Sequence, residues 1–258
     1  MTTDDREVLM IIDVQNDFCP GGALAVPEGD AILPAVNRLA RSFAHVILTQ
    51  DWHPPKHASF ASTHPGKRPF DAIEVSYGAQ TLWPDQCIQG TQGAAFHPNL
   101  DVPHAELVLR KGFRSAIDSY SAFRENDRRT ATGLTGYMKE RGFERITLCG
   151  LATDFCVLFS AIDAQEAGFE VSVATSACRG IDVDGSLARA MRSMSEAGVT
   201  VRAEVERARP LFGAAANDVR PERWEAFSAA GAARNREPYS HPRRPPVPPA
   251  ESKIAAEY

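Results

Sequence analysis

Short apolar runs recur along the first 203 residues, and segments with helical spacing separate most of them. An apolar run of this length, bounded by polar or turn-forming residues, predicts a buried strand. Six such runs lie at residues 7–14, 45–51, 105–111, 145–151, 169–176 and 199–203. Because neighbouring parallel strands need a long crossover, usually a helix, we predict an α/β fold. We expect a three-layer α/β/α sandwich with a six-stranded, mainly parallel sheet.

The helical segments between these runs have recognisable ends. Apolar residues at helical spacing predict helices over residues 30–43, 130–142, 155–169 and 184–197. Gly142 and Gly198 follow two of them as C-terminal stops, and Asp30 is an N-cap residue type at the start of the first. Residues 52–104 show little periodicity and many Pro, Gly and His residues, so we predict a long ordered loop region with room for one short helix.

The pattern of buried elements stops near residue 207. We therefore predict one α/β domain over residues 1–207 and a C-terminal tail over residues 208–258. The tail is biased towards Ala, Arg and Pro and contains the run PRRPPVPP, which predicts a largely disordered segment. A short helix over residues 221–230, docked through Trp224 and Phe227, is the alternative.

Charge and cysteine content narrow the choice of partner. The chain has 258 residues, a formal net charge of -5 and a pI near 5.8. These values give no electrostatic reason to expect nucleic acid or an anionic membrane as a partner, so we expect a small molecule. The five cysteines lack CxxC spacing, and no targeting segment is recognisable at the N-terminus. Reduced thiols in a cytoplasmic location fit this pattern.

Cys156 lies where a predicted strand turns into a predicted helix. Thr153 and Asp154 are N-cap residue types, which places the cysteine in the first helical turn. Unpaired backbone N–H groups and the positive end of the helix dipole stabilise a thiolate there, so we expect a lowered thiol pKa. A small packed hydrophobic residue is the alternative reading of this cysteine.

Other reactive side chains end neighbouring strands. Asp13, Asp51 and Lys111 close three of the apolar runs, and Cys156 follows a fourth. In an open parallel sheet, ligands bind outside the carboxyl ends of the strands. We therefore expect these four residues to lie within reach of one another at one edge of the sheet.

Five motifs, in a fixed order, carry a resemblance to a known family. They are IIDVQNDFCPGGALAV, TQDWHPPKHASFAS, LWPDQC, KGFRSAIDSYSAF and GLATDFCV. The chain from about Met10 to Ala203 resembles the nicotinamidase/pyrazinamidase branch of the isochorismatase-like cysteine hydrolases. The resemblance implies the isochorismatase-like hydrolase fold and a cysteine nucleophile.

The resemblance assigns roles to the residues at the strand ends. It implies a catalytic triad of Asp13, Lys111 and Cys156 and a cis peptide between Leu151 and Ala152. The thiolate would attack an amide carbonyl, and the backbone N–H groups of Ala152 and Cys156 would form the oxyanion hole. It also implies an aromatic slot for a pyridine ring, with residues that are Phe18, Trp83 and Tyr120 in this chain.

A metal site is the last feature that the resemblance implies. Asp51 and His53 would bind a divalent Zn, Mn or Fe ion, and Ser59 would contribute through water. The family pattern WPxHC supplies a third ligand, but this chain has WPDQC, so Gln86 offers only a neutral amide oxygen. We therefore predict a weakly bound metal. In the alignment that this resemblance favours, His57 faces away from the metal and is expected at the surface.

The implied activity is conversion of nicotinamide to nicotinate and ammonia in NAD salvage, with pyrazinamide as a further substrate. Two alternatives stay open. One is a cysteine hydrolase of the same family that acts on another small amide or carbamoyl compound. The other is a metal-depleted relative that binds its ligand without turnover. The sequence also leaves a homo-oligomer open.

Overall fold

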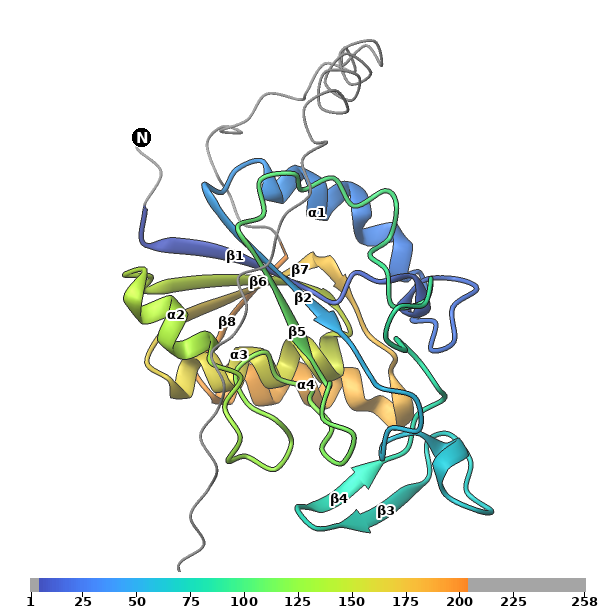
Figure 1. Ribbon diagram of the computed structural model, residues 1–258. Helices are drawn as coiled ribbons and strands as arrows, with labels where there is room; N and C mark the ends of the chain where they lie inside the picture. The colour runs from blue at the N-terminus through green and yellow to red at the C-terminus, as the bar shows by residue number, and fades with distance from the viewer. Residues whose placement is uncertain (1–4, 204–258) are drawn as a thin grey trace, which may run out of the picture. The chain divides into compact units, whose positions relative to one another are not determined.

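A parallel sheet of six strands forms the centre of the described structure (Figure 1). The computed structural model describes residues 5–203. The strand order of this sheet is β5-β2-β1-β6-β7-β8, and every pairing within it is parallel. The strands are β1 (Glu7–Ile12), β2 (His45–Asp51), β5 (Leu107–Lys111), β6 (Arg145–Leu151), β7 (Glu170–Arg179) and β8 (Thr200–Arg202). The predicted α/β fold with six mainly parallel strands is confirmed.

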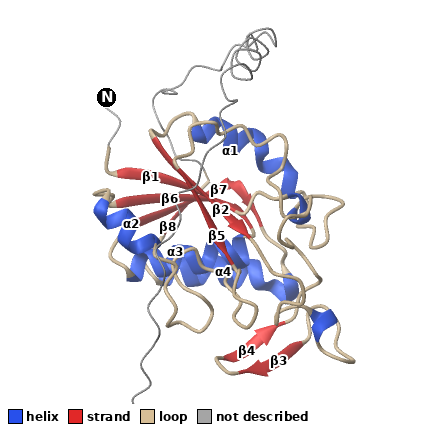
Figure 2. Cartoon of the chain, in the orientation of Figure 1, coloured by secondary structure: helices blue, strands red, loops and turns tan. Residues whose placement is uncertain are grey.

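Helices cover both faces of this sheet, as Figure 2 shows. The α-helices are α1 (Leu33–Ala40), α2 (Leu134–Glu140), α3 (Leu158–Glu166) and α4 (Ser186–Glu196). α1 lies on one side, and α2, α3 and α4 lie on the other. From β1 the chain first moves outward through β2 to β5 and then returns to β6 on the opposite side of β1. The strand order therefore reverses between β1 and β6, where sheets of this kind bind ligands.

The two central strands are almost completely buried. Residues 8–12 of β1 and 146–151 of β6 are all buried, because helices cover both faces of the sheet. Such strands read as continuous apolar runs rather than alternating ones, which is why the sequence pattern identified them.

The helices are shorter than their hydrophobic patterns predicted. The segment 30–43 divides into a 3-10 turn (Gly29–Ile32) and α1, and Asp30 lies inside that turn rather than capping the helix. α2 begins at Leu134, although the pattern began at residue 130. Gly142 and Gly198 have φ angles of +73° and +84° directly after α2 and α4, so both helices end as predicted.

The prediction for residues 52–104 was incomplete. This region contains an antiparallel hairpin of β3 (Ala72–Val75) and β4 (Gly78–Thr81) in addition to a 3-10 turn (Ala61–Thr63). Its strands have four residues each and are largely exposed or half-buried. Strands this short and this exposed lack a readable hydrophobic pattern.

Strand register brings the reactive ends together. Asp51, the last residue of β2, is paired with Lys111, the last residue of β5. Ile12 at the end of β1 is paired with Gly150 of β6. A Cβ at Gly150 would lie 2.1 Å from the carbonyl oxygen of Ile12, so this close approach requires glycine.

Some sequence predictions concern other parts of the chain. The predicted tail over residues 208–258, with Trp224 and Phe227, lies outside the described residues. Within residues 5–203, no helix is both long and apolar enough to cross a membrane.

Candidate active site

Cys156 lies in a π-helical turn between β6 and α3. The turn covers Thr153–Val157, and its N-cap is Ala152, so Thr153 and Asp154 do not cap it as predicted. The Asp154 carboxylate instead accepts hydrogen bonds from the backbone N–H groups of Ile181 and Asp182, at 3.0 and 2.8 Å. These contacts tie the cysteine turn to the loop after β7. Single π-helical turns of this kind are frequent at functional sites.

The peptide bond that enters this turn, between Leu151 and Ala152, is cis. This confirms the conformation that the sequence resemblance implied.

Lys111 joins the predicted nucleophile to the predicted base. Its Nζ atom lies 2.9 Å from Oδ2 of Asp13 and 3.4 Å from Sγ of Cys156. It also donates hydrogen bonds to the carbonyl of Ser119, at 2.9 Å, and to the carboxylate of Asp51. Both Lys111 and Asp13 are completely buried. The structure therefore brings together all four residues that the sequence placed at the strand ends.

Asp13 is held in a fixed orientation from a second strand. It follows β1 with a φ angle of +46°, and its Oδ1 accepts a hydrogen bond of 2.6 Å from the Thr49 hydroxyl. The same hydroxyl accepts a hydrogen bond from the backbone N–H of Asp13, at 3.1 Å. Thr49 was not singled out in the sequence, since its position inside an apolar strand carries no chemical signal.

Burial and the neighbouring charges together shift the pKa values in this cluster. Burial raises the pKa of the Cys156 thiol well above its usual value, although the Lys111 ammonium opposes the shift. The expected lowering of that pKa by the helix dipole was therefore wrong. Burial works to lower the pKa of Lys111, but Asp13 and Asp51 hold it well above the usual value. The resting site thus has a protonated thiol beside a permanent ammonium, and the thiol needs a base.

A cavity opens in front of Cys156. Its walls include the three aromatic residues that the resemblance implied, Phe18, Trp83 and Tyr120. A fourth aromatic residue, Phe155, also lines it and stands perpendicular to Trp83, with ring centroids 4.9 Å apart. Phe155 was missed because its position next to the nucleophile reads equally well as helix core. Flat apolar walls beside a reactive thiol suit a small planar ring.

The aromatic walls are fixed by hydrogen bonds. The indole N–H of Trp83 and the Nε2 group of Gln80 both donate to the Tyr120 hydroxyl, each at 3.2 Å. Gln80 also donates to Oδ2 of Asp118, at 2.8 Å. This network connects the ring slot to the acidic residue behind it.

Two of the predicted metal ligands line the same cavity. Asp51 and Gln86 both line it, and Oε1 of Gln86 is buried without a hydrogen-bond partner among the described residues. Burial raises the pKa of Asp51 to about 6, with Lys111 opposing the shift. Nε2 of His53 lies 3.4 Å from Oδ1 of Asp118. These nitrogen and oxygen donors suit a divalent ion such as Zn or Mn.

His57 and Ser59 lie behind His53. His57 is completely buried, so the expectation of a surface histidine was wrong. Its ring packs against His53, with centroids 4.6 Å apart, and its Nδ1 lies 2.8 Å from the Ser59 hydroxyl. The alignment could not show this because His57 is four residues from His53 in a loop whose path is set by tertiary contacts.

Asp118 is the main site residue that sequence reasoning missed. It lies in the quoted motif KGFRSAIDSYSAF but was given no role. It is 2% exposed and lines the cavity. Burial works to raise its pKa, yet the hydrogen bond with His53 holds the pKa of this carboxyl below its usual value. A buried acid beside a predicted metal ligand was the available signal.

A family model described as the isochorismatase domain matches residues 7–204. The chain belongs to the isochorismatase family. The match includes all six strands of the main sheet and every site residue described above. The isochorismatase domain thus contains the cysteine turn, the Lys111 cluster and the cavity.

Similar proteins come from several bacteria. The chain is 54% identical to a nicotinamidase of Acinetobacter baylyi over 191 residues, which are 74% of this chain and 89% of that protein. It is 44% identical to a nicotinamidase of Escherichia coli over 199 residues, covering 75% and 92% of the two chains.

Solved structures agree with these matches. A nicotinamidase/pyrazinamidase of Acinetobacter baumanii superimposes with a TM-score of 0.77 at 54% identity, covering 78% of this chain and 97% of that one. A pyrazinamidase of Pyrococcus horikoshii, solved in complex with zinc, gives a TM-score of 0.63 at 34% identity and covers 76% and 98%.

Proposed function

We propose that this chain is a nicotinamidase, an amidohydrolase that converts nicotinamide to nicotinate and ammonia in NAD salvage. The observation that carries the proposal is the buried Lys111 ammonium, which contacts both Asp13 and Cys156 at the end of an aromatic cavity. Similarity to nicotinamidases over three quarters of the chain supports the same activity. Pyrazinamide, whose ring is also flat, is a second substrate of the proposed reaction.

The first half of the reaction uses Asp13 as the base. Its carboxylate and Sγ of Cys156 lie within 4.8 Å of one another, so the thiol proton passes to Asp13 as sulfur attacks the amide carbon. Lys111 stabilises the Asp13 carboxylate before the proton transfer and the negative charge that develops on sulfur during it. The backbone N–H groups of Ala152 and Cys156 are proposed to receive the oxyanion, a contribution of about 3 kcal/mol in comparable sites.

The second half returns the enzyme to its resting state. The C–N bond breaks, Asp13 gives its proton to the leaving nitrogen, and ammonia departs from a thioester on Cys156. Asp13 then accepts a proton from water, which attacks the thioester carbon. Breakdown of the second tetrahedral intermediate returns the Asp13 proton to sulfur and releases the product as nicotinic acid, which becomes nicotinate by giving its own proton to ammonia or to solvent.

A divalent ion beside the cavity is part of the proposal. In the predicted arrangement Asp51 and His53 hold a Zn, Mn or Fe ion with the Gln86 amide oxygen, and Ser59 contributes through water. When bound, the ion supplies a Lewis-acid contact for a ring nitrogen of the substrate. Phe18, Trp83 and Tyr120 align the ring, which leaves the amide facing Cys156. A cytoplasmic location stays a prediction.

The direct test is ammonia release from nicotinamide. The unmodified protein should release ammonia, Cys156→Ala should release none, and Cys178→Ala should match the unmodified protein. Cys178 is the matched control because it is also a buried thiol but lies in β7, outside the cavity lining. Equal ammonia release by the unmodified protein and Cys156→Ala would exclude the proposed nucleophile.

A further inference from the structure

Gln80 is the one buried side chain of the β3–β4 hairpin. It is 1% exposed, whereas the other residues of the two strands are exposed or half-buried. Taking an amide out of water costs free energy unless new hydrogen bonds replace those to water. The Gln80 amide must therefore find its partners within the protein.

The nitrogen end of this amide contacts two residues that line the cavity. Nε2 of Gln80 donates hydrogen bonds to Oδ2 of Asp118 at 2.8 Å and to the Tyr120 hydroxyl at 3.2 Å. It also donates to the carbonyl of Thr81 at 2.7 Å, so two hydrogens serve three acceptors and one of them is shared. Because an ionised carboxylate only accepts, the amide is oriented with Nε2 towards Asp118.

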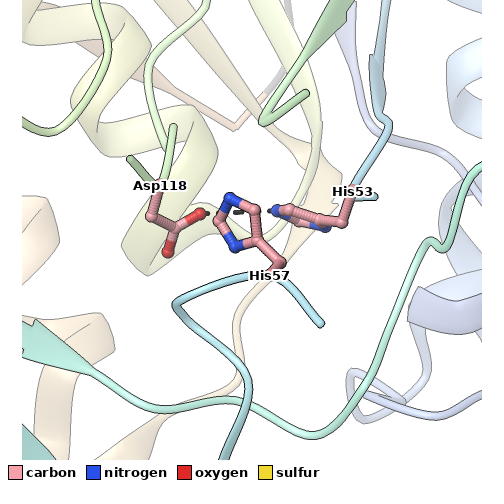
Figure 3. Close-up of side chains that lie close together, drawn as sticks. All are labelled: His53, His57 and Asp118. Carbon is pink, nitrogen blue, oxygen red and sulfur yellow. Dashed lines mark hydrogen bonds and ion pairs between the residues drawn. The ribbon is translucent and has the colours of Figure 1, made fainter. Parts of the chain in front are cut away.

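The Asp118 carboxylate is held through its other oxygen. Its Oδ1 accepts a hydrogen bond of 2.8 Å from the backbone N–H of Ser119. The same oxygen lies 3.4 Å from Nε2 of His53, and Figure 3 shows the carboxylate directed towards the imidazole rings. The acceptor that receives Gln80 therefore has a fixed place in the loop after β5.

The oxygen end of the Gln80 amide contacts the same loop at a second place. Its Oε1 accepts from Nδ2 of Asn126 at 3.4 Å and from the Tyr77 hydroxyl at 2.9 Å. Oδ1 of Asn126 in turn accepts from the backbone N–H of Tyr120, at 3.0 Å. The backbone N–H of Asn126 donates to the carbonyl of Asp118 at 2.8 Å, which closes this segment on itself. Gln80 thus contacts three side chains of the loop that carries Tyr120.

Gln80 also lies close in sequence to another wall of the cavity. It belongs to β4, and Trp83 follows shortly after that strand. The Trp83 indole donates to the Tyr120 hydroxyl at 3.2 Å, and the two ring centroids are 6.1 Å apart. Two residues of one segment therefore hold the hydroxyl of an adjoining wall. Gln80 itself is not among the residues that line the cavity.

We propose that Gln80 is a positioning residue for the aromatic wall of the cavity. It fixes the Tyr120 ring relative to Trp83 and so sets the affinity for the planar ring of the substrate, without touching the reacting atoms. The inference rests on the proposed function and adds the β3–β4 hairpin to the parts of the chain that determine substrate affinity. A glutamine that only anchored the hairpin would affect stability and leave substrate binding unchanged.

Steady-state ammonia release by Gln80→Met tests this role. Methionine is an unbranched side chain without an N–H group, so Tyr120 loses one of its two donors. The KM for nicotinamide should rise at least about 10-fold and kcat should change less than about 3-fold, because the wall holds the ring equally in ground and transition states. An unchanged KM with a lower melting temperature would overturn the inference. If Gln80→Met does not fold, the shorter amide of Gln80→Asn takes its place, with a rise in KM again expected.

Gly78→Ala separates Gln80 from the hairpin as a whole. Gly78 begins β4 with a φ angle of +116°, and a Cβ there would meet nothing within 4 Å, so alanine strains only the backbone. Its melting temperature should fall while the KM stays unchanged. Gln89→Met removes a glutamine that donates to the Trp52 carbonyl outside the cavity lining, and it should also leave the KM unchanged. An equal rise in KM in Gly78→Ala and Gln80→Met would overturn the specific role of Gln80.

Tyr120→Phe tests whether Gln80 acts through the hydroxyl that it contacts. Phenylalanine keeps the ring and removes the shared acceptor. The rise in KM of the double variant should be smaller than the product of the two single rises, because residues that act through one contact are not additive. A rise equal to that product would show that Gln80 does not act through Tyr120.

Calorimetric titration of nicotinamide into Cys156→Ala keeps binding and hydrolysis apart. Adding Gln80→Met to this variant should weaken nicotinamide binding by at least about 10-fold. Ammonia release with an unchanged KM in Gln80→Met would refute the positioning role and leave the amidase intact. Weakened nicotinamide binding in the double variant, without ammonia release by the unmodified protein, would refute the amidase alone.

Discussion

Lys111 is a fully buried cation with two carboxylates and a thiol as neighbours. Taking such a charge out of water costs several kcal/mol, which Asp13 and Asp51 offset as counter-charges. Removing one partner of such a buried ion pair therefore lowers the free energy of unfolding strongly, because the other charge stays buried without compensation. The same cation is needed in the proposed reaction to stabilise the Asp13 carboxylate and the Cys156 thiolate. Stability and catalysis thus depend on the same side chain and can be separated by a second substitution.

Lys111→Met should lower the free energy of unfolding by about 3–5 kcal/mol, because it leaves two buried carboxylates without a cation. Ammonia release should fall by at least about 100-fold. Adding Asp51→Asn to Lys111→Met removes one of the unpaired charges and should restore part of the stability but none of the activity. Urea unfolding and the ammonia assay measure the two effects. Equal stability of the unmodified and Lys111→Met proteins would contradict the ion-pair argument.

Glu125 provides a test of pH dependence outside the proposed catalytic residues. Burial raises its pKa from 4.5 to about 7, with Arg114 opposing the shift, and its Oε2 has no hydrogen-bond partner within the described residues. Between these pH values the folded state binds more protons than the unfolded state. Stability should therefore fall as pH rises from about 4.5 to 7 and then level off.

Glu125→Gln should remove this loss. The quantity to compare is the free energy of unfolding of Glu125→Gln minus that of the unmodified protein. This difference should be on the order of 1 kcal/mol more positive at pH 8 than at pH 4.5, since the half-exposed Arg114 and solvent screen part of the charge. Thermal unfolding at the two pH values measures the difference. Glu140→Gln, on an exposed position of α2, serves as the control and should show no comparable difference. A pH-independent effect of Glu125→Gln would contradict the raised pKa.

At the level of strands and helices, the sequence was most informative where burial was continuous. β1 and β6 were readable because both faces are covered, and the ends of these two strands then located Asp13 and Cys156. The π-helical turn was not readable, since its residues have the same apolar spacing as an α-helix. The β3–β4 hairpin carries no strong period, and the contact of His57 with His53 depends on the path of a loop. What was missed is tertiary: loop path, side-chain partners and desolvation of the thiol.

Gly112 directly follows β5 and lies against His53, one of the predicted metal ligands. Its φ angle is +67°, and a Cβ there would lie 2.7 Å from Nε2 of His53. Gly112→Ala should combine a backbone cost of about 1–2 kcal/mol with displacement of the imidazole. We expect a lower free energy of unfolding, a lower affinity for a divalent ion and slower ammonia release. Urea unfolding, Co²⁺ titration and the ammonia assay measure these three effects.

Gly142→Ala is the matched variant for this prediction. Gly142 has a similar φ of +73°, but a Cβ there would meet nothing within 4 Å. It should show the backbone cost alone, with unchanged Co²⁺ affinity and ammonia release per folded molecule. If both variants retain Co²⁺ binding equally, Gly112 does not position His53.

Residues 5–203 contain the six-stranded sheet, helices on both of its faces and every proposed site residue. The matching segments of the related proteins agree, since 74–75% of this chain covers 89–92% of the nicotinamidases of A. baylyi and E. coli. A chain that ends at Arg207 should therefore melt within about 2 °C of the full-length protein and release ammonia at the same rate. A chain that ends at Gly198 should melt at least about 5 °C lower, because it lacks β8 and the buried Val199. Calorimetry and the ammonia assay on the three proteins measure melting temperature and activity. A large fall in the melting temperature on truncation at Arg207 would mean that residues 208–258 contribute to the folded domain.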